Sequence, residues 1–182
     1  MRRLGIFLTT VALIAGMVGC GQSTPPEEAV TFADTNLGAA VREAIGMPEG
    51  PIYPEDLQAL TSLHAYERNI EYLAGLLHCV SLSTLYLGLN QISDISPLAN
   101  LTNLTDLDLG SNQISDISPL ANLSSLIWLG LHHNQIGDIS PLFDNAGLDD
   151  GDEVWLGENP LSEESIDEYI PELEARGVYV AY

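Results

Sequence analysis

The stretch Asn-Gln-Ile-Ser-Asp-Ile-Ser-Pro-Leu-Ala-Asn-Leu occurs twice in the chain, at Asn90–Leu101 and again at Asn112–Leu123. The two copies lie 22 residues apart, and the same offset continues the apolar pattern in both directions. Three of the resulting columns are Leu60, Leu82, Leu104 and Leu126, then Leu63, Leu85, Leu107 and Leu129, then Ala65, Leu87, Leu109 and Leu131. A repeat of this length cannot bury its own apolar side chains, so successive copies must stack and share one core.

Each copy contains one short strand. Leu85-Tyr86-Leu87 alternates apolar and polar side chains, which is typical of a strand with one buried face. Stacked copies would pair these strands in parallel, ~4.8 Å apart. The rest of each copy returns the chain through Pro97, Pro119 or Pro141, and a proline makes a full α-helix in the return segment unfavourable.

An asparagine follows the strand in four copies, at Asn90, Asn112, Asn134 and Asn159. Its side-chain amide donates and accepts hydrogen bonds at once, so it can satisfy backbone groups that stacking would otherwise bury unpaired. We interpret this column as a structural ladder and not as a binding site. The first copy has Arg68 at the same position, so we expect the ladder to end there.

The pattern Leu-x-x-Leu-x-Leu-x-x-Asn-x-Ile-x-x-Ile-x-x-Leu resembles the leucine-rich repeat, specifically the 22-residue bacterial type of internalin-like surface proteins. The resemblance covers residues 60–161. It implies an α/β fold: a right-handed solenoid, or short horseshoe, with a parallel sheet on the concave side and 3₁₀-like turns on the convex side. The last copy departs from the pattern, because it matches only after three extra residues within Phe143–Glu153.

The open ends of a solenoid expose its core and need lids. For the N-terminal cap, residues 31–59, we expect a helix that Asp34 caps and Gly46 ends, followed by a short helix over Pro54–Leu57. The apolar stripe of the first helix is Leu37, Ala40, Val41, Ala44 and Ile45.

For the C-terminal cap, residues 162–182, we expect a helix that begins at Ser162 and is broken or kinked at Pro171. The side chains predicted to be buried along it are Ile166, Ile170 and Leu173. A closing strand over Val178-Tyr179-Val180 follows. With both lids, residues 31–182 are predicted to form a single domain.

The chain begins like an exported protein. Arg2 and Arg3 precede an uncharged apolar run over 4–18, which is short of the ~20 residues usual for a membrane span and predicts a signal peptide over 1–19. Met17-Val18-Gly19-Cys20 resembles a bacterial lipobox, which implies cleavage before Cys20 and lipidation of its thiol. The alternative is an ordinary signal peptide followed by a coincidental cysteine. Residues 20–30 are polar and proline-bearing and would form a tether, so we expect a lipid-anchored protein of the bacterial cell envelope, outside the cytoplasm.

The chain is strongly acidic. It has 26 aspartates and glutamates, five arginines and no lysine, a formal charge of −21. Loss of Arg2 and Arg3 with the signal would leave −23, and such a charge excludes nucleic-acid binding. Solubility is the interpretation that we favour for this charge, and attraction of cations or of a basic partner is the alternative. In the acidic cluster Asp149–Glu153, an EF-hand is excluded because Ala146 and Leu148 would occupy ligand positions, whereas a weaker calcium site stays an alternative.

The sequence carries no recognisable catalytic motif: no Gly-x-Ser-x-Gly, His-Glu-x-x-His, phosphate-binding loop or Cys-x-x-Cys. His132 and His133 have no third metal ligand in register. Cys79 aligns with the core positions Leu101 and Leu123, so we expect it to be buried and inert. We therefore predict a protein without enzymatic activity, cofactor or metal.

The concave face of the sheet is where we expect a ligand, because its residues vary while the scaffold repeats. The candidate contact residues are Tyr66, Tyr86, Asp106, Asp108, Trp128, His132, Glu153 and Trp155. Exposed aromatic side chains on a rigid sheet are typical anchors for recognition. The alternative is that the tryptophans merely cover neighbouring glycines such as Gly130 and Gly157.

The leading hypothesis is a monomeric, membrane-anchored binding module that recognises a protein or peptide. The first alternative is a carbohydrate or cell-wall binding protein that uses the same aromatic face, since sugars stack on tryptophan. The second is a passive surface lipoprotein whose acidity is its main property.

Overall fold

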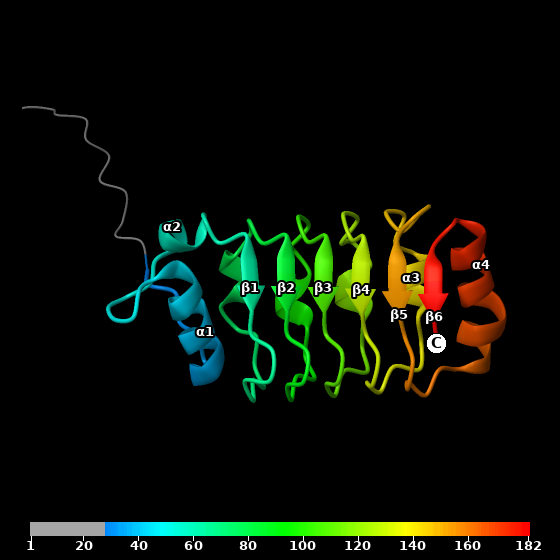
Figure 1. Ribbon diagram of the computed structural model, residues 1–182, viewed down its shortest axis with the longest axis horizontal. Coiled ribbons are helices and arrows are strands. Elements are labelled where there is room, and N and C mark those ends of the chain that lie inside the picture. The colour runs from blue at the N-terminus through cyan, green and yellow to red at the C-terminus, as the bar shows by residue number, and fades with distance from the viewer. Residues whose placement is uncertain (1–27) are drawn as a thin grey trace, which may run out of the picture.

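The computed structural model describes residues 28–182, in which the repeats stack into one elongated solenoid (Figure 1). Six short strands form a single parallel sheet, and each strand pairs with the next one along the chain. The strands are β1 (Ser62–His64), β2 (Thr84–Tyr86), β3 (Asp106–Asp108), β4 (Trp128–Gly130), β5 (Glu153–Trp155) and β6 (Tyr179–Ala181). The signal peptide, Cys20 and most of the tether predicted over 20–30 lie outside the described residues.

The strand register reproduces the sequence period. Leu63, Leu85, Leu107 and Leu129 are direct partners across β1 to β4, 22 residues apart. The partner of Leu129 on β5 is Val154, so three additional residues enter between these strands, as the sequence predicted. The closing strand β6 begins one residue later than predicted and adds a sixth strand to the five of the repeats.

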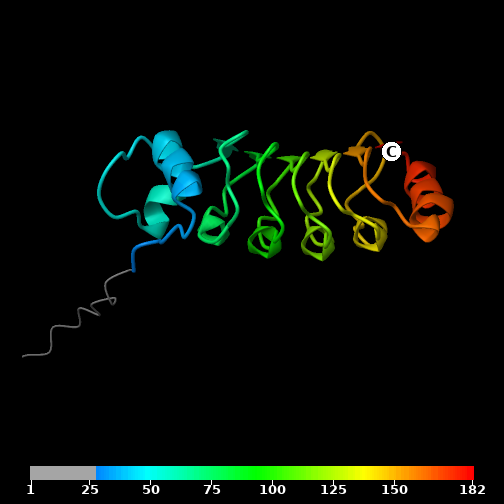
Figure 2. The ribbon, with the colours of Figure 1, turned by 90° about the horizontal axis from the view of Figure 1, so that it is seen from below.

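Short helical turns form the layer opposite the sheet, and Figure 2 shows the two layers edge-on. Three are 3₁₀ turns, η1 (Leu76–His78), η2 (Ser96–Leu98) and η3 (Ser118–Leu120), and the fourth is a single α-helical turn, α3 (Ser140–Phe143). Proline occupies the first turn in η2, η3 and α3, where its missing N–H costs no hydrogen bond. In these three turns an aspartate lies two residues before the first residue of the turn and fixes its start. Asp94 Oδ1, for example, accepts from the Ser96 N–H at 2.8 Å.

The core lies between these two layers and consists of the repeated leucines and isoleucines, which are almost completely buried. Burial of one such side chain stabilises the fold by ~1.5–3 kcal/mol, so the stacked columns supply most of the driving force. Cys79 belongs to this core and is fully buried, and burial raises the pKa of its thiol to about 12.

The asparagine column runs along one edge of the core. Asn112 illustrates the arrangement: its Nδ2 donates to Leu87 O and Leu109 O, both at 3.0 Å, and its Oδ1 accepts from the Ile92 N–H at 3.0 Å. Asn90, Asn134 and Asn159 make the same kinds of bond one repeat away. Each side chain thus joins the backbone of its own repeat to that of the preceding one.

Helices α1 (Thr35–Ile45) and α2 (Pro54–Leu57) cap the N-terminal end. Asp34 caps α1 by accepting from the Asn36 and Leu37 N–H groups at 2.9 and 3.0 Å, and Gly46 ends the helix at φ 70°. The predicted burial of Ala44 is wrong, because this side chain is exposed. The residues of α1 that are buried against the first repeat are Leu37, Ala40 and Val41, and Ile45 is half-buried.

Asp34 also forms hydrogen bonds to the first repeat, which has no ladder asparagine of its own. Its Oδ2 accepts from the N–H groups of Glu71 and Tyr72 in the first repeat, at 2.7 and 3.2 Å. Burial alone would raise the pKa of Asp34, but the hydrogen bonds from Glu71, Leu37, Tyr72 and Asn36 outweigh it and lower that pKa. Arg68, which replaces the ladder asparagine, instead reaches Glu43 of α1 at 3.0 Å.

At the C-terminal end, a helix continues through a π-helical turn, η4 (Ser165–Tyr169), into α4 (Ile170–Ala175). Pro171 is predicted to break or kink this helix; the helix is not broken there, and its irregularity is the π-helical turn just before the proline. The predicted burial of Ile166 is wrong, because its side chain points outward and is 38% exposed. Within the π-helical turn it is Ser165 that is buried. Ile170 and Leu173 are buried as predicted. Across residues 28–182, no helix combines the length and the apolar character that crossing a membrane requires.

Candidate functional site

The sheet presents one continuous surface to solvent, which we call the strand face: the outward side chains of β1–β6 and of the residues directly after each strand. In β1 to β3 the middle residue is buried and its two neighbours point outward. Six of the eight candidate residues lie on β2 to β5, whereas Tyr66 and His132 follow β1 and β4 by two residues. All eight lie on the strand face.

Glycines on this face leave space that neighbouring aromatic rings fill. A Cβ added at Gly88 would stand 3.0 Å from Tyr66 Cδ2, and one added at Gly130 would stand 2.7 Å from Trp128 Cη2. The ring of His132 occupies the corresponding space over Gly110. Three aromatic rings therefore occupy space that is open because the neighbouring residue is a glycine.

The two tryptophans differ in this respect. Trp128 does cover Gly130, as the alternative interpretation of the sequence expected. Trp155 leaves Gly157 open, because a Cβ added there would meet nothing within 4 Å. Trp155 instead meets Tyr179 of β6 edge to face, with ring centroids 5.7 Å apart, and its Nε1 donates to Glu153 Oε2 at 3.2 Å.

Asp108 occupies the centre of the strand face. Its Oδ1 accepts from the Gly110 N–H at 2.9 Å and would lie 3.0 Å from a Cβ at Gly130, where the Trp128 ring also lies. Its Oδ2 would lie 3.0 Å from a Cβ at Gly88, beside the Tyr66 ring. The carboxylate thus stands between two aromatic rings that come from different repeats.

The N-terminal end of the face carries a second stacked pair. His64 and Tyr86 lie parallel, with centroids 4.9 Å apart and an interplanar angle of 24°. Ser62 Oγ and His64 Nε2 are 3.0 Å apart, which fixes the imidazole that supports Tyr86. The face therefore has aromatic groups at both ends, with the carboxylate of Asp108 between them.

The strand face is negatively charged. Asp106, Asp108 and Glu153 project from it, and the exposed Glu67 and Glu158 follow β1 and β5 by three residues. Within residues 28–182, each of the three arginines is engaged elsewhere: Arg42 with the carbonyls of Met47 and Gly50, Arg68 with Glu43, and Arg176 over the ring of Phe143 at 4.8 Å.

A metal centre is not evident in the described part of the chain, where no group of three or more His, Cys, Asp or Glu side chains could hold an ion. The rings of His132 and His133 meet edge to face, with 5.7 Å between centroids, and His133 has a left-handed φ of 53°. In the acidic cluster Asp149–Glu153, the buried Asp152 uses Oδ2 to accept from the Asp149 N–H at 2.9 Å. That carboxylate closes a turn.

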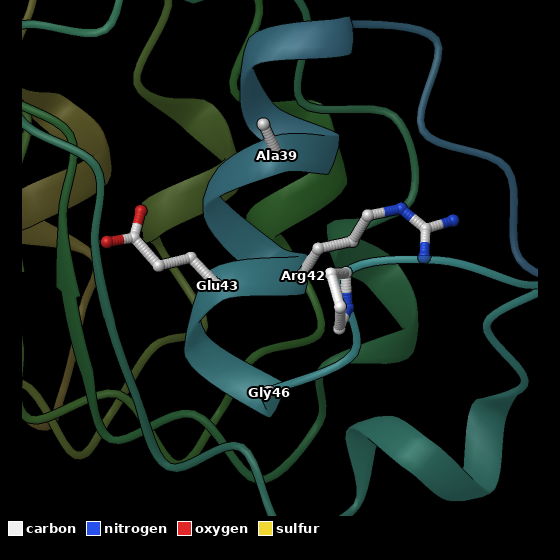
Figure 3. Close-up of a pocket in the computed structure, with 5 residues that line it drawn as sticks. Ala39, Arg42, Glu43 and Gly46 are labelled. Atoms are coloured by element: carbon white, nitrogen blue, oxygen red, sulfur yellow. The ribbon is translucent and has the colours of Figure 1, made fainter.

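A hollow of about 460 Å³ lies beside α1, away from the sheet, and is lined by Ala39, Arg42, Glu43, Gly46 and Pro48. Figure 3 shows Arg42 and Glu43 leaving the helix on opposite sides. Arg42 holds the following loop through Gly50 O at 2.8 Å, and Glu43 pairs with Arg68. Both charged side chains therefore hold parts of the N-terminal cap in place.

Comparison with known proteins agrees with the repeat fold. Residues 80–122 match the family of leucine-rich repeats in two copies. No curated protein sequence matches the chain. Among solved structures, an internalin, inlF, from Listeria monocytogenes is similar over 83% of this chain and 56% of its own length, with 24% identity and a TM-score of 0.55.

Two further internalins of the same organism are similar at lower scores. Internalin C2 shares 26% identity over 83% of this chain and 93% of its own, with a TM-score of 0.44. The functional domain of InlJ shares 20% identity over 72% of this chain and 38% of its own, with a TM-score of 0.42. This chain spans little more than half of the inlF structure, and its likeness to that structure concerns the fold. With the repeat match over residues 80–122, the parallel sheet and the 3₁₀ turns, the chain has the leucine-rich-repeat solenoid fold, similar to that of an internalin.

Proposed function

We propose that this protein is a binding module that recognises another protein or a peptide through the strand face. The observation that carries the proposal is the set of aromatic rings fixed on a rigid sheet, with Tyr66, Trp128 and Trp155 at or near the surface. Large, rigid aromatic side chains lose little conformational entropy on binding and dominate the energetics of interfaces. Six strands at ~4.8 Å spacing give a sheet about 24 Å across, a size suited to a modest interface.

A capture experiment tests this proposal. The purified protein and two strand-face variants, Trp128→Ala and Trp155→Ala, are used to capture proteins from an envelope extract. Ser96→Gln is the matched control, since Ser96 is exposed on η2 in the opposite layer. Each tryptophan variant should weaken capture by more than about fivefold, equivalent to ~1 kcal/mol, while its melting temperature stays close to that of the parent. Loss of capture only in Ser96→Gln would place the site on the other layer.

Carbohydrate or cell-wall binding is the second candidate, and Trp155 with Tyr179 favours it. Both rings are substantially exposed, at 37% and 56%, and meet at an edge of the strand face where a sugar ring could stack. A glycan array separates the two functions: binding to a defined glycan that Trp155→Ala abolishes would replace protein recognition. No captured protein and no bound glycan would leave the passive acidic lipoprotein as the better account.

We further propose that the module is attached to a membrane outside the cytoplasm through a lipid on Cys20, which lies outside the described residues. The support is the sequence before it, a basic start and an apolar run that ends in Gly19-Cys20. Cys20→Ser should release the protein from membranes or block its processing. A Cys20→Ser protein that still fractionates as a processed, lipid-bearing species would refute the anchor.

A further inference from the structure

Asp108 on the strand face uses one carboxylate oxygen in a hydrogen bond, and its other oxygen accepts none from the described part of the chain. Oδ1 accepts from the Gly110 N–H at 2.9 Å, whereas Oδ2 has no hydrogen-bond donor among residues 28–182. The free oxygen faces the place above Gly88 where the Tyr66 ring lies. An ionised oxygen in this position offers a charge-assisted hydrogen bond to an incoming donor.

Aromatic rings flank the carboxylate on both sides. Trp128 approaches from β4 over Gly130, and Tyr66 approaches from the segment after β1 over Gly88. Neither ring could lie there if the glycine beneath it carried a side chain, because an added Cβ would come within 2.7 to 3.0 Å of ring atoms. A cation next to Asp108 would therefore lie beside two aromatic rings, and a cation over the face of a ring is attracted to it, most strongly over tryptophan.

The charge at this place is not balanced by the protein itself. The three arginines of the described region serve the caps, and the chain has no lysine. Asp106 lies two residues away on the same strand, and its Oδ2 accepts from Thr105 Oγ1 at 2.6 Å. The strand face therefore presents two carboxylates near its centre without a cationic partner.

From this arrangement we infer that the group formed by Tyr66, Asp108 and Trp128 on the strand face binds an arginine side chain of the protein partner. A guanidinium is flat, so it can stack on a ring, and its N–H groups can bond to Asp108 Oδ2 at the same time. A metal ion fits less well, since no third ligand side chain is near. The inference rests on the proposed function and specifies the chemistry of the partner.

The probe is a short acetylated and amidated peptide, Gly-Gly-Arg-Gly-Gly, compared with its counterpart in which citrulline replaces arginine. Citrulline keeps the shape of the side chain and removes its charge. Binding is followed by tryptophan fluorescence of the purified protein. The arginine peptide should bind weakly but saturably, and the citrulline peptide about tenfold more weakly, because the cation–π contact and the charge-assisted hydrogen bond are both lost.

Three variants locate the contact. Asp108→Asn keeps an acceptor for the Gly110 N–H and should weaken arginine binding about tenfold. Asp116→Asn removes the same charge from the exposed return segment and should change binding less than twofold, which separates a local contact from the overall negative field. Trp128→Leu should weaken binding without any change in charge.

The inference is overturned if neither peptide binds, if arginine and citrulline bind equally, or if Asp108→Asn and Asp116→Asn act alike. These results are distinct from failure of the proposed function. If Trp128→Ala abolishes protein capture while Asp108→Asn does not affect it, the strand face is the recognition surface but arginine is not what enters it.

Discussion

Replacing Asn112 by alanine should destabilise the solenoid far more than the loss of one exposed amide would. The side chain is only 9% exposed and bonds to four backbone groups: the Ile92 N–H and the carbonyls of Leu87, Leu109 and Gly110. The carbonyls of Leu87 and Leu109 also accept from Asn90 Nδ2 and Asn134 Nδ2. Among these groups, the substitution therefore leaves the Ile92 N–H buried without a partner, at a cost of ~1–3 kcal/mol. For a domain of this size that corresponds to a melting temperature lower by roughly 2–12 °C.

Thermal unfolding followed by circular dichroism measures this effect. The matched control is Gln113→Ala, which truncates the neighbouring exposed amide and should change the free energy of unfolding by less than ~0.5 kcal/mol. If the two variants melt at the same temperature, the asparagine column does not join the repeats and the bonding described for Asn112 is wrong.

Three further predictions concern the caps, the last repeat and the core. The pKa of Asp34 is lowered in the folded state from its ordinary 3.8, so its contribution to stability is present above that pH and is lost as pH falls through the lowered pKa. The difference in unfolding free energy between the parent and Asp34→Asn should therefore shrink below pH ~4, and a pH-independent difference would contradict it. Gly147→Ala should cost more than ~2 kcal/mol, because the added Cβ would collide with the backbone of Ser124, whereas Gly157→Ala should be nearly neutral; equal urea midpoints would refute this. Cys79 should resist thiol reagents at pH 8 until the protein unfolds, because burial raises its pKa to about 12, and rapid labelling of the folded protein would contradict its place in the core.

The repeat period contains most of what is needed to predict the fold. Columns such as Leu85, Leu107 and Leu129 define both the strand register and the buried face, because a fixed offset of 22 residues leaves one way to stack the copies. Features that break the period could not be predicted in the same way. Ile166 points outward because a π-helical turn shifts the helical register, and a helical pattern in the sequence does not reveal such a turn.

The candidate site was predictable in part. Alternation along a strand indicates that Trp128 and Asp108 point outward, but not where the tryptophan ring lies relative to the carboxylate, which depends on the glycines beside them. Tyr179 is missing from the predicted set because β6 lies outside the repeats and has no column to align with. Asn145, which is fully buried and donates to Leu120 O and Leu123 O, sits in the insertion, where the 22-residue offset fails.

The most direct test of recognition through the strand face uses the indole N–H signals of the protein in nuclear magnetic resonance spectra. The chain has two tryptophans, Trp128 and Trp155, and both lie on this face. When a captured partner is added to the ¹⁵N-labelled protein, both indole signals should shift or broaden, while the amide signals of Ser96 and Ser118 on the opposite layer stay unchanged. Unchanged indole signals together with shifts at Ser96 and Ser118 would contradict the account.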